Sequence, residues 1–120
     1  MDSDAAGKQI IQDSFEREGR SMDDPSVANL NYVRGVIHGL MALKGLENAK
    51  EVGNMSSGSD FREGMFQIND WNVRGLAEPF TYEEGDRRPT MSGRVYQVQD
   101  GAFEYDTTID LPRKDEWIGL

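Results

Sequence analysis

The chain has 120 residues, enough for one domain, with 22 acidic and 13 basic side chains and a net charge of −9. This charge argues against nucleic acid and anionic membrane surfaces as partners, because both attract clustered Lys and Arg. The absence of cysteine excludes disulfides, cysteine-ligated zinc and thiol catalysis, and no apolar run approaches the roughly 18 residues of a membrane span.

Two helices are predicted in the first part of the chain. Ile10, Ile11 and Phe15 recur at helical spacing within residues 4–18, and Gly19 suits the end of that helix. Residues 20–25 form a polar connection. A longer helix is expected from residue 26 or 29 to about residue 50. Its apolar stripe has a period near 3.6 and consists of Leu30, Val33, Ile37, Leu40, Met41 and Leu46.

Two glycines lie one turn apart inside the second predicted helix. Gly35 and Gly39 each cost about 1 kcal/mol relative to Ala in a helix interior. Such a cost is compensated when another element packs closely against the helix. We therefore expect a neighbouring element to approach this pair.

A third, short helix is predicted after a loop over residues 51–59. Asp60 and Glu63 have the spacing of a capping box, with Asp in place of the usual Ser or Thr. Phe61, Met65 and Phe66 give the helix one apolar face.

The second part of the chain predicts strands. Residues 94–99 are rich in strand-forming side chains, and residues 102–109 alternate apolar and polar side chains as a half-buried strand does. Asp100 and Gly101 suit a tight turn between them, and residues 78–82 are a candidate edge strand that begins near Pro79. The expected fold is α+β: two to three helices over residues 1–70, then a small antiparallel hairpin sheet over residues 71–120. Together they form a single domain or a fragment.

No metal or cofactor site is predicted. Asp2, Asp4, Gly7 and Asp13 imitate the spacing of a calcium loop, but Ala6 occupies a ligand position and no helix can precede the loop. Acidic residues at a helix N-terminus explain the same pattern.

No enzyme signature is present either. His38 is the only histidine, and its neighbours one helical turn away include no acid that would orient it as a general base. Arg87 and Arg88 lie among acidic residues, which predicts a salt-bridged loop rather than an anion site. We expect a protein that is not an enzyme.

Several short motifs follow one another along the chain: FEREG (15–19), YVRG (32–35), FREG (61–64), PFTY (79–82), GDRRPT (85–90), VYQV (95–98), DG (100–101) and WI (117–118). Their order resembles the C-terminal part of type I periplasmic substrate-binding proteins, in the branched-chain amino acid (Leu/Ile/Val-binding) class of ABC transporters. The resemblance covers roughly residues 13–118 of this chain but only about the last third of a usual family member.

The resemblance implies a function in transport. Family members close two lobes over a small polar ligand, such as an amino acid or an amide, and deliver it to an ABC permease. The positions matching a ligand-contacting region are Asn29, Asn31 and Tyr32. The alternative for these residues is structural, with Tyr32 in the core and the asparagines capping the helix.

The chain lacks the family's first lobe and most of its second, so we expect it to be incomplete as a ligand binder alone and to self-associate as a homo-oligomer. The alternative function is a stand-alone α+β interaction module; a small hydrolase that uses His38 is a third. The family implies a periplasmic location. The polar N-terminus MDSDAAGKQ is not a signal peptide, which predicts a cytoplasmic location if this is the whole gene product.

Overall fold

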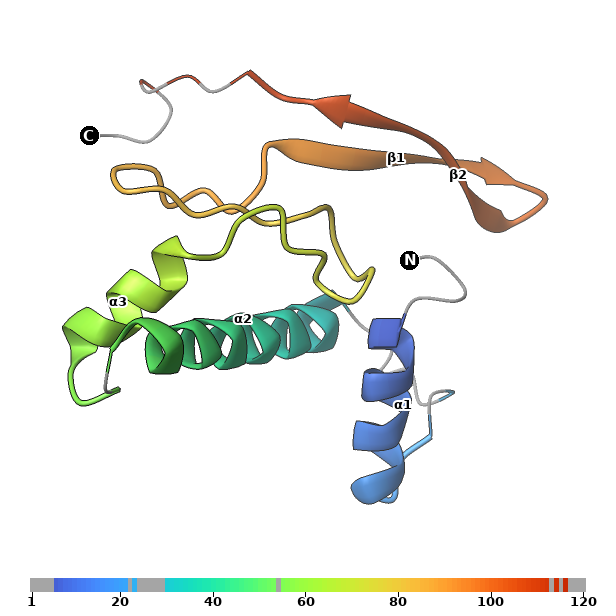
Figure 1. The fold of residues 1–120 in the computed structure, drawn as a ribbon. Coiled ribbons are helices and arrows are strands. Elements are labelled where there is room, and N and C mark those ends of the chain that lie inside the picture. The colour runs from blue at the N-terminus through green and yellow to red at the C-terminus, as the bar shows by residue number, and fades with distance from the viewer. Residues whose placement is uncertain are drawn as a thin grey trace.

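The computed structural model describes residues 6–21, 23, 30–53, 55–112, 114 and 116. In chain order these residues form α1 (Ala6–Arg17), α2 (Leu30–Val52), α3 (Gly58–Phe66), β1 (Ser92–Gln99) and β2 (Ala102–Asp110). Figure 1 shows the helices on one side, the hairpin on the other, and the irregular chain of residues 67–91 running between them. The predicted α+β fold, with three helices followed by an antiparallel hairpin, is confirmed.

Helix α1 is held at both of its ends. Gly19 has φ of 68°, and the Arg20 N–H donates to the Phe15 carbonyl over 2.9 Å, so the glycine ends the helix as predicted. At the other end, the Gly7 N–H donates to the Arg74 carbonyl over 2.9 Å. A Cβ on Gly7 would lie 2.2 Å from Cγ of Leu76. The glycine therefore allows α1 to contact the irregular segment directly.

Helices α2 and α3 cross with their backbones in contact. A Cβ on Gly64 of α3 would lie 2.3 Å from the carbonyl oxygen of Gly45 and 2.6 Å from the nitrogen of Ala49, both in α2. The buried Asn48 side chain joins the two helices at the same place by donating to the Gly64 carbonyl over 3.0 Å. The crossing thus requires glycine at position 64 and a small residue at position 45.

The predicted close approach at Gly35 and Gly39 is wrong. Both glycines are exposed, and a Cβ on either would meet nothing within 4 Å. The close approach falls two turns later on the same helix, where Gly45 faces α3. Glycine spacing in the sequence does not show which side of α2 another helix packs against.

The predicted cap of α3 is also displaced. The N-cap is Ser57, whose hydroxyl accepts from the Asp60 N–H over 3.3 Å. Asp60 occupies the third helical position and accepts from the N–H of Ser56 over 2.9 Å. The N-cap therefore lies three residues earlier than predicted, and Asp60 adds a second cap by binding the residue before it. The hydrogen bond from the Ser56 backbone lowers the pKa of Asp60.

The core consists of two small clusters along α2. In the first, Ile11 and Phe15 of α1 pack against the start of α2. In the second, Ile68, Val73 and Phe80 of the irregular segment pack against the middle of the helix. Apolar side chains of α2 join both clusters: Tyr32, Val33 and Val36 the first, Ile37, Leu40 and Met41 the second. Helix α2 is therefore the element around which the others gather.

The irregular segment is fixed to itself and to the hairpin. Trp71 and Phe80 exchange two backbone hydrogen bonds of 2.9 and 3.0 Å. The predicted edge strand at residues 78–82 is wrong, because this stretch forms only that isolated bridge and does not join the sheet. The guanidinium of Arg94 in β1 binds the carboxylate of Glu78, which ties the hairpin to the segment.

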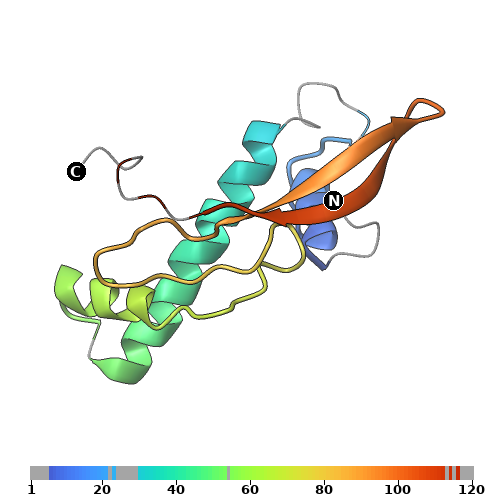
Figure 2. The ribbon, with the colours of Figure 1, turned by 90° about the horizontal axis from the view of Figure 1, so that it is seen from above.

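The hairpin has the predicted turn but not the predicted burial. Asp100 and Gly101 have φ of 50° and 82°, the positive values that a tight type I′ turn requires. Every residue of β2 is exposed, so the predicted half-buried strand is wrong. A register shift beside Val95 and Tyr96 marks a bulge between the strands. Figure 2 shows the turn projecting beyond the helices.

The molecule is extended for its length. The radius of gyration is 16.7 Å, whereas a compact chain of this size has about 14 Å. Of the described residues, none belongs to a helix long and apolar enough to cross a membrane.

The helix crossing yields a stability test. We expect Gly64→Ala to lower the free energy of unfolding by about 1–3 kcal/mol, because its methyl group would overlap the backbone of α2. The matched control is Gly39→Ala on the exposed side of α2, which we expect to stabilise by about 0.5–1 kcal/mol. Urea unfolding followed by circular dichroism measures both. Equal stabilities for the two variants would contradict the crossing.

The α3 cap yields a pH test. Because the folded-state pKa of Asp60 is lowered, its ionised form contributes stability above the unfolded value of about 3.9. That contribution is lost as the pH falls through the folded-state pKa. We expect Asp60→Asn to be less stable than wild type at pH 7 and the gap to shrink below about pH 4, as measured by urea midpoints. Glu63→Gln, which removes an exposed charge from the same helix, is the control. A gap that stays constant down to pH 3 would contradict the cap.

Candidate functional site

Two of the three candidate ligand-binding residues, Asn31 and Tyr32, lie in the first turn of α2. Asn29 lies outside the described residues. Asn31 is exposed in the first turn of α2, and Tyr32 is half-buried. The structure therefore places Tyr32 against α1 and leaves Asn31 at the surface.

Tyr32 has both an apolar and a polar contact. Its ring packs on Phe15, with 4.4 Å between the ring centroids and a tilt of 47°. Its hydroxyl lies 2.7 Å from the Ser14 hydroxyl. The ring of Tyr32 thus packs against the core, as the structural alternative expects. Its hydroxyl contacts a polar side chain of α1.

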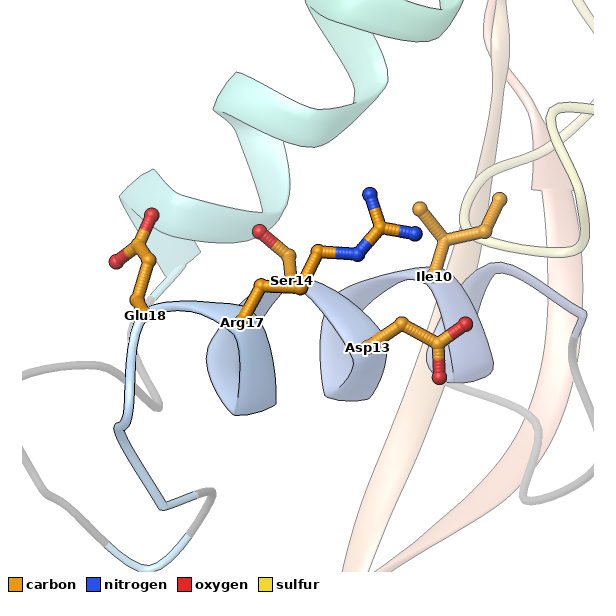
Figure 3. Close-up of a pocket in the computed structure, with 5 residues that line it drawn as sticks. All are labelled: Ile10, Asp13, Ser14, Arg17 and Glu18. Carbon is orange, nitrogen blue, oxygen red and sulfur yellow. The ribbon is translucent and has the colours of Figure 1, made fainter.

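An open hollow of about 480 Å³ lies along this surface of α1 and is lined by Ile10, Asp13, Ser14, Arg17 and Glu18. In Figure 3 Ser14 and Glu18 point toward the start of α2, and the Arg17 side chain extends back over the helix toward Ile10. All five residues lie on or directly after α1, and their helical spacing is the one sequence signal that they share.

The hollow carries charge of both signs. Asp13 accepts from the Gln9 amide over 2.7 Å, and Glu18 lies 3.6 Å from Arg20. Arg17 forms no ion pair within the part of the chain that the structure describes. A guanidinium, two hydroxyls and two carboxylates are the groups that bind the carboxylate and ammonium ends of an amino acid.

A second open hollow of about 650 Å³ lies between the end of α3 and the polar loop of residues 84–88. Arg62 pairs with Glu84 over 3.2 Å and lies over the Phe66 ring, 5.3 Å from its centroid. The Arg88 guanidinium donates two hydrogen bonds to the Asp86 carboxylate, over 2.9 and 2.8 Å. The predicted salt-bridged loop is confirmed for Arg88.

Arg87 is exposed and forms no ion pair with any described residue, so the salt bridge stays a prediction for this arginine. The two acidic side chains of the loop are nevertheless both paired, because Arg62 binds Glu84 and Arg88 binds Asp86.

The described residues contain no cluster of side chains suited to metal binding and no histidine paired with an acid. His38 is exposed on α2, and no group of three or more His, Cys, Asp or Glu side chains among the described residues could hold a metal ion. Burial raises the pKa of Tyr82, whose hydroxyl contacts the sulfur of Met41 over 3.9 Å. Tyr82 belongs to the core and lines neither hollow.

Comparison with known proteins adds no relative: no protein family, curated protein or solved structure matches this chain. The geometry of the two hollows and the exposed surfaces is therefore the basis for assigning a function.

The contact between Ser14 and Tyr32 is testable. We expect Tyr32→Phe and Ser14→Ala each to lower the free energy of unfolding by about 0.5–1.5 kcal/mol, because each removes the same hydrogen bond. The double variant is expected to lose no more than the larger single loss. A double variant whose loss equals the sum of the two would show that the hydroxyls do not interact. Urea unfolding of the four proteins measures the coupling.

Proposed function

We propose that this chain is the closing segment of an ABC-transporter solute-binding protein and takes part in binding an amino acid, an amide or a similar small polar molecule. The resemblance of its motifs to the branched-chain amino acid class motivates the proposal. In this proposal the chain is not an enzyme. It binds ligand only together with the rest of a two-lobed protein.

The observation that carries the proposal is the amount of apolar surface left uncovered. Large apolar side chains on α2 are exposed, among them Leu30 (65%), Leu43 (58%) and Val52 (53%). Helix α2 is apolar on most of its sides, which is typical of a helix enclosed by other elements. The two core clusters cover only part of it. Further protein packing against α2 would explain both the exposure and the extended shape.

The α1 hollow supports the ligand class. It combines the guanidinium of Arg17, which forms no ion pair with any described residue, with the Ser14 hydroxyl and the carboxylates of Asp13 and Glu18. The Tyr32 hydroxyl contacts that of Ser14. A zwitterionic ligand needs donors at one end and acceptors at the other. The hollow is open on one side, so this chain supplies one wall of a site and the remaining lobes would supply the other.

The second candidate is a stand-alone interaction module that associates through the same surfaces. It is favoured by the hairpin, whose second strand is exposed along its whole length. The two candidates differ in what covers the exposed surfaces: the rest of the same protein in the first, and a separate protein in the second.

Three measurements separate these candidates. If the chain is a closing segment, we expect light scattering to give a mass above that of a monomer, since exposed apolar surfaces associate. We also expect the DNA upstream of the Met1 codon to encode the missing lobes, in frame or after a frameshift. The protein extended by those lobes would gain thermal stability from an amino acid or amide, by about 2.7 kcal/mol at a ligand concentration of 100 times Kd.

The same extended protein carrying Arg17→Gln would lose most of that gain, and Arg34→Gln, at an exposed arginine of α2 outside the hollow, is the control. A monomeric chain with one cooperative thermal transition and no response to amino acids or amides would refute the proposal and favour the interaction module.

A further inference from the structure

Strand β2 has one paired edge and one open edge. Its inner edge pairs with β1 from Ala102 to Asp110, and among the described residues no strand or loop pairs with its outer edge. All nine of its residues are exposed. An open edge presents backbone N–H and C=O groups that an extended segment of another chain can pair with.

One face of the hairpin adds apolar surface beside that edge. Tyr96 pairs across the strands with Tyr105, and Val98 pairs with Phe103. The two tyrosine rings meet edge to face at 6.0 Å between centroids, while Phe103 is 80% and Val98 67% exposed. An added strand would therefore find aromatic neighbours on this face.

The hairpin is also strongly acidic. Residues 92–110 contain four acids, Asp100, Glu104, Asp106 and Asp110, against the single arginine Arg94. That arginine is already bound to Glu78. Strand β2 itself contains three acids and no basic residue. Its open edge therefore attracts positive charge.

The same charges argue against a second copy of this chain as the occupant. In an antiparallel pairing of two β2 strands centred on Tyr105, Glu104 of one copy would face Asp106 of the other. In a parallel pairing in register, each acid would lie beside its own copy. Like charges directly opposite each other destabilise a sheet. Two chains of net charge −9 also repel each other overall.

We propose that the open edge of β2 binds an extended basic segment of a partner protein, which adds to the hairpin as a third strand. Lys or Arg of the segment would lie beside Glu104 and Asp106. Apolar residues alternating with them would lie beside Phe103 and Tyr105. This inference does not depend on the proposed transport function, because it rests on the edge, charge and side chains of the hairpin alone.

The experiment uses the whole chain and a short fluorescein-labelled peptide in which Lys and Val alternate. Fluorescence anisotropy is expected to show saturable binding that weakens with salt. A peptide of the same composition with Lys and Val in two blocks is the control for sequence pattern, and we expect it to bind more weakly. Equal binding of both peptides, or no binding at millimolar concentration, would overturn the proposal.

Variants of the chain test the site. We expect Glu104→Gln together with Asp106→Asn to weaken binding about two- to fivefold for each charge removed. Glu16→Gln together with Glu63→Gln removes two exposed helical acids and so makes the same change in net charge away from the hairpin. If the two double variants weaken binding equally, the attraction is only the general charge of the chain and the proposal is refuted.

Hydrogen exchange locates the peptide independently of the variants. We expect amides of β2 to exchange more slowly when the peptide is bound, while amides of α2 and α3 are unchanged. Phe103→Thr keeps a strand-forming residue but removes the aromatic neighbour, and we expect it to weaken binding without altering the exchange of the free hairpin. Protection confined to the helices would overturn the placement on β2.

Discussion

The contact between Gly64 and the backbone of α2 is the constraint on which the arrangement of the chain depends. Because position 64 has no side chain, α3 lies close enough for its carbonyl to receive the Asn48 amide at 3.0 Å. The chain leaves α3 two residues later, and Ile68 enters the core at once. The Trp71–Phe80 bridge and the cluster around Val73 follow from that entry point.

The contact between Gly64 and α2 also positions the hairpin, but indirectly, through the irregular segment. The irregular segment lies on α2 through Val73 and Phe80, and its Glu78 holds Arg94 of β1. Arg94 also donates to the carbonyls of Gly75 and Ala77, each over 3.4 Å. These bonds fix only the start of β1. The far half of the hairpin has no such support in the described residues, and this explains why its side chains are exposed.

The sequence predicted elements well and their packing poorly. Period and turn residues located the three helices, the hairpin and the Asp100–Gly101 turn, because these depend on neighbours within a few residues. The sequence predicted a close contact at Gly35 and Gly39, whereas the structure has it at Gly45. Spacing carries no information about which face of a helix meets another element. Alternation in β2 predicted half-burial for the same reason: it shows that a strand can bury one face, not that anything covers it.

The candidate site was predictable only in part. Tyr32 was identified through the resemblance, but its partner Ser14 lies 18 residues earlier and became visible only when α1 and α2 were placed side by side. The other residues of the hollow occupy the same side of α1 and are unremarkable in sequence. The contact between Ser14 and Tyr32 joins two helices, so neither helical pattern alone could predict it.

The acidic residues of β2 connect the exposed edge with the behaviour of the whole chain. Exposed edge strands invite pairing with copies of themselves, and charged side chains are a common protection against it. In β2 this protection has one sign only, so it repels a second copy while it favours a basic strand. A mixture of signs would have protected the edge without selecting a partner. Self-association of this chain would therefore proceed through exposed apolar side chains of α2, such as Leu43 and Leu46, and would leave the hairpin edge open.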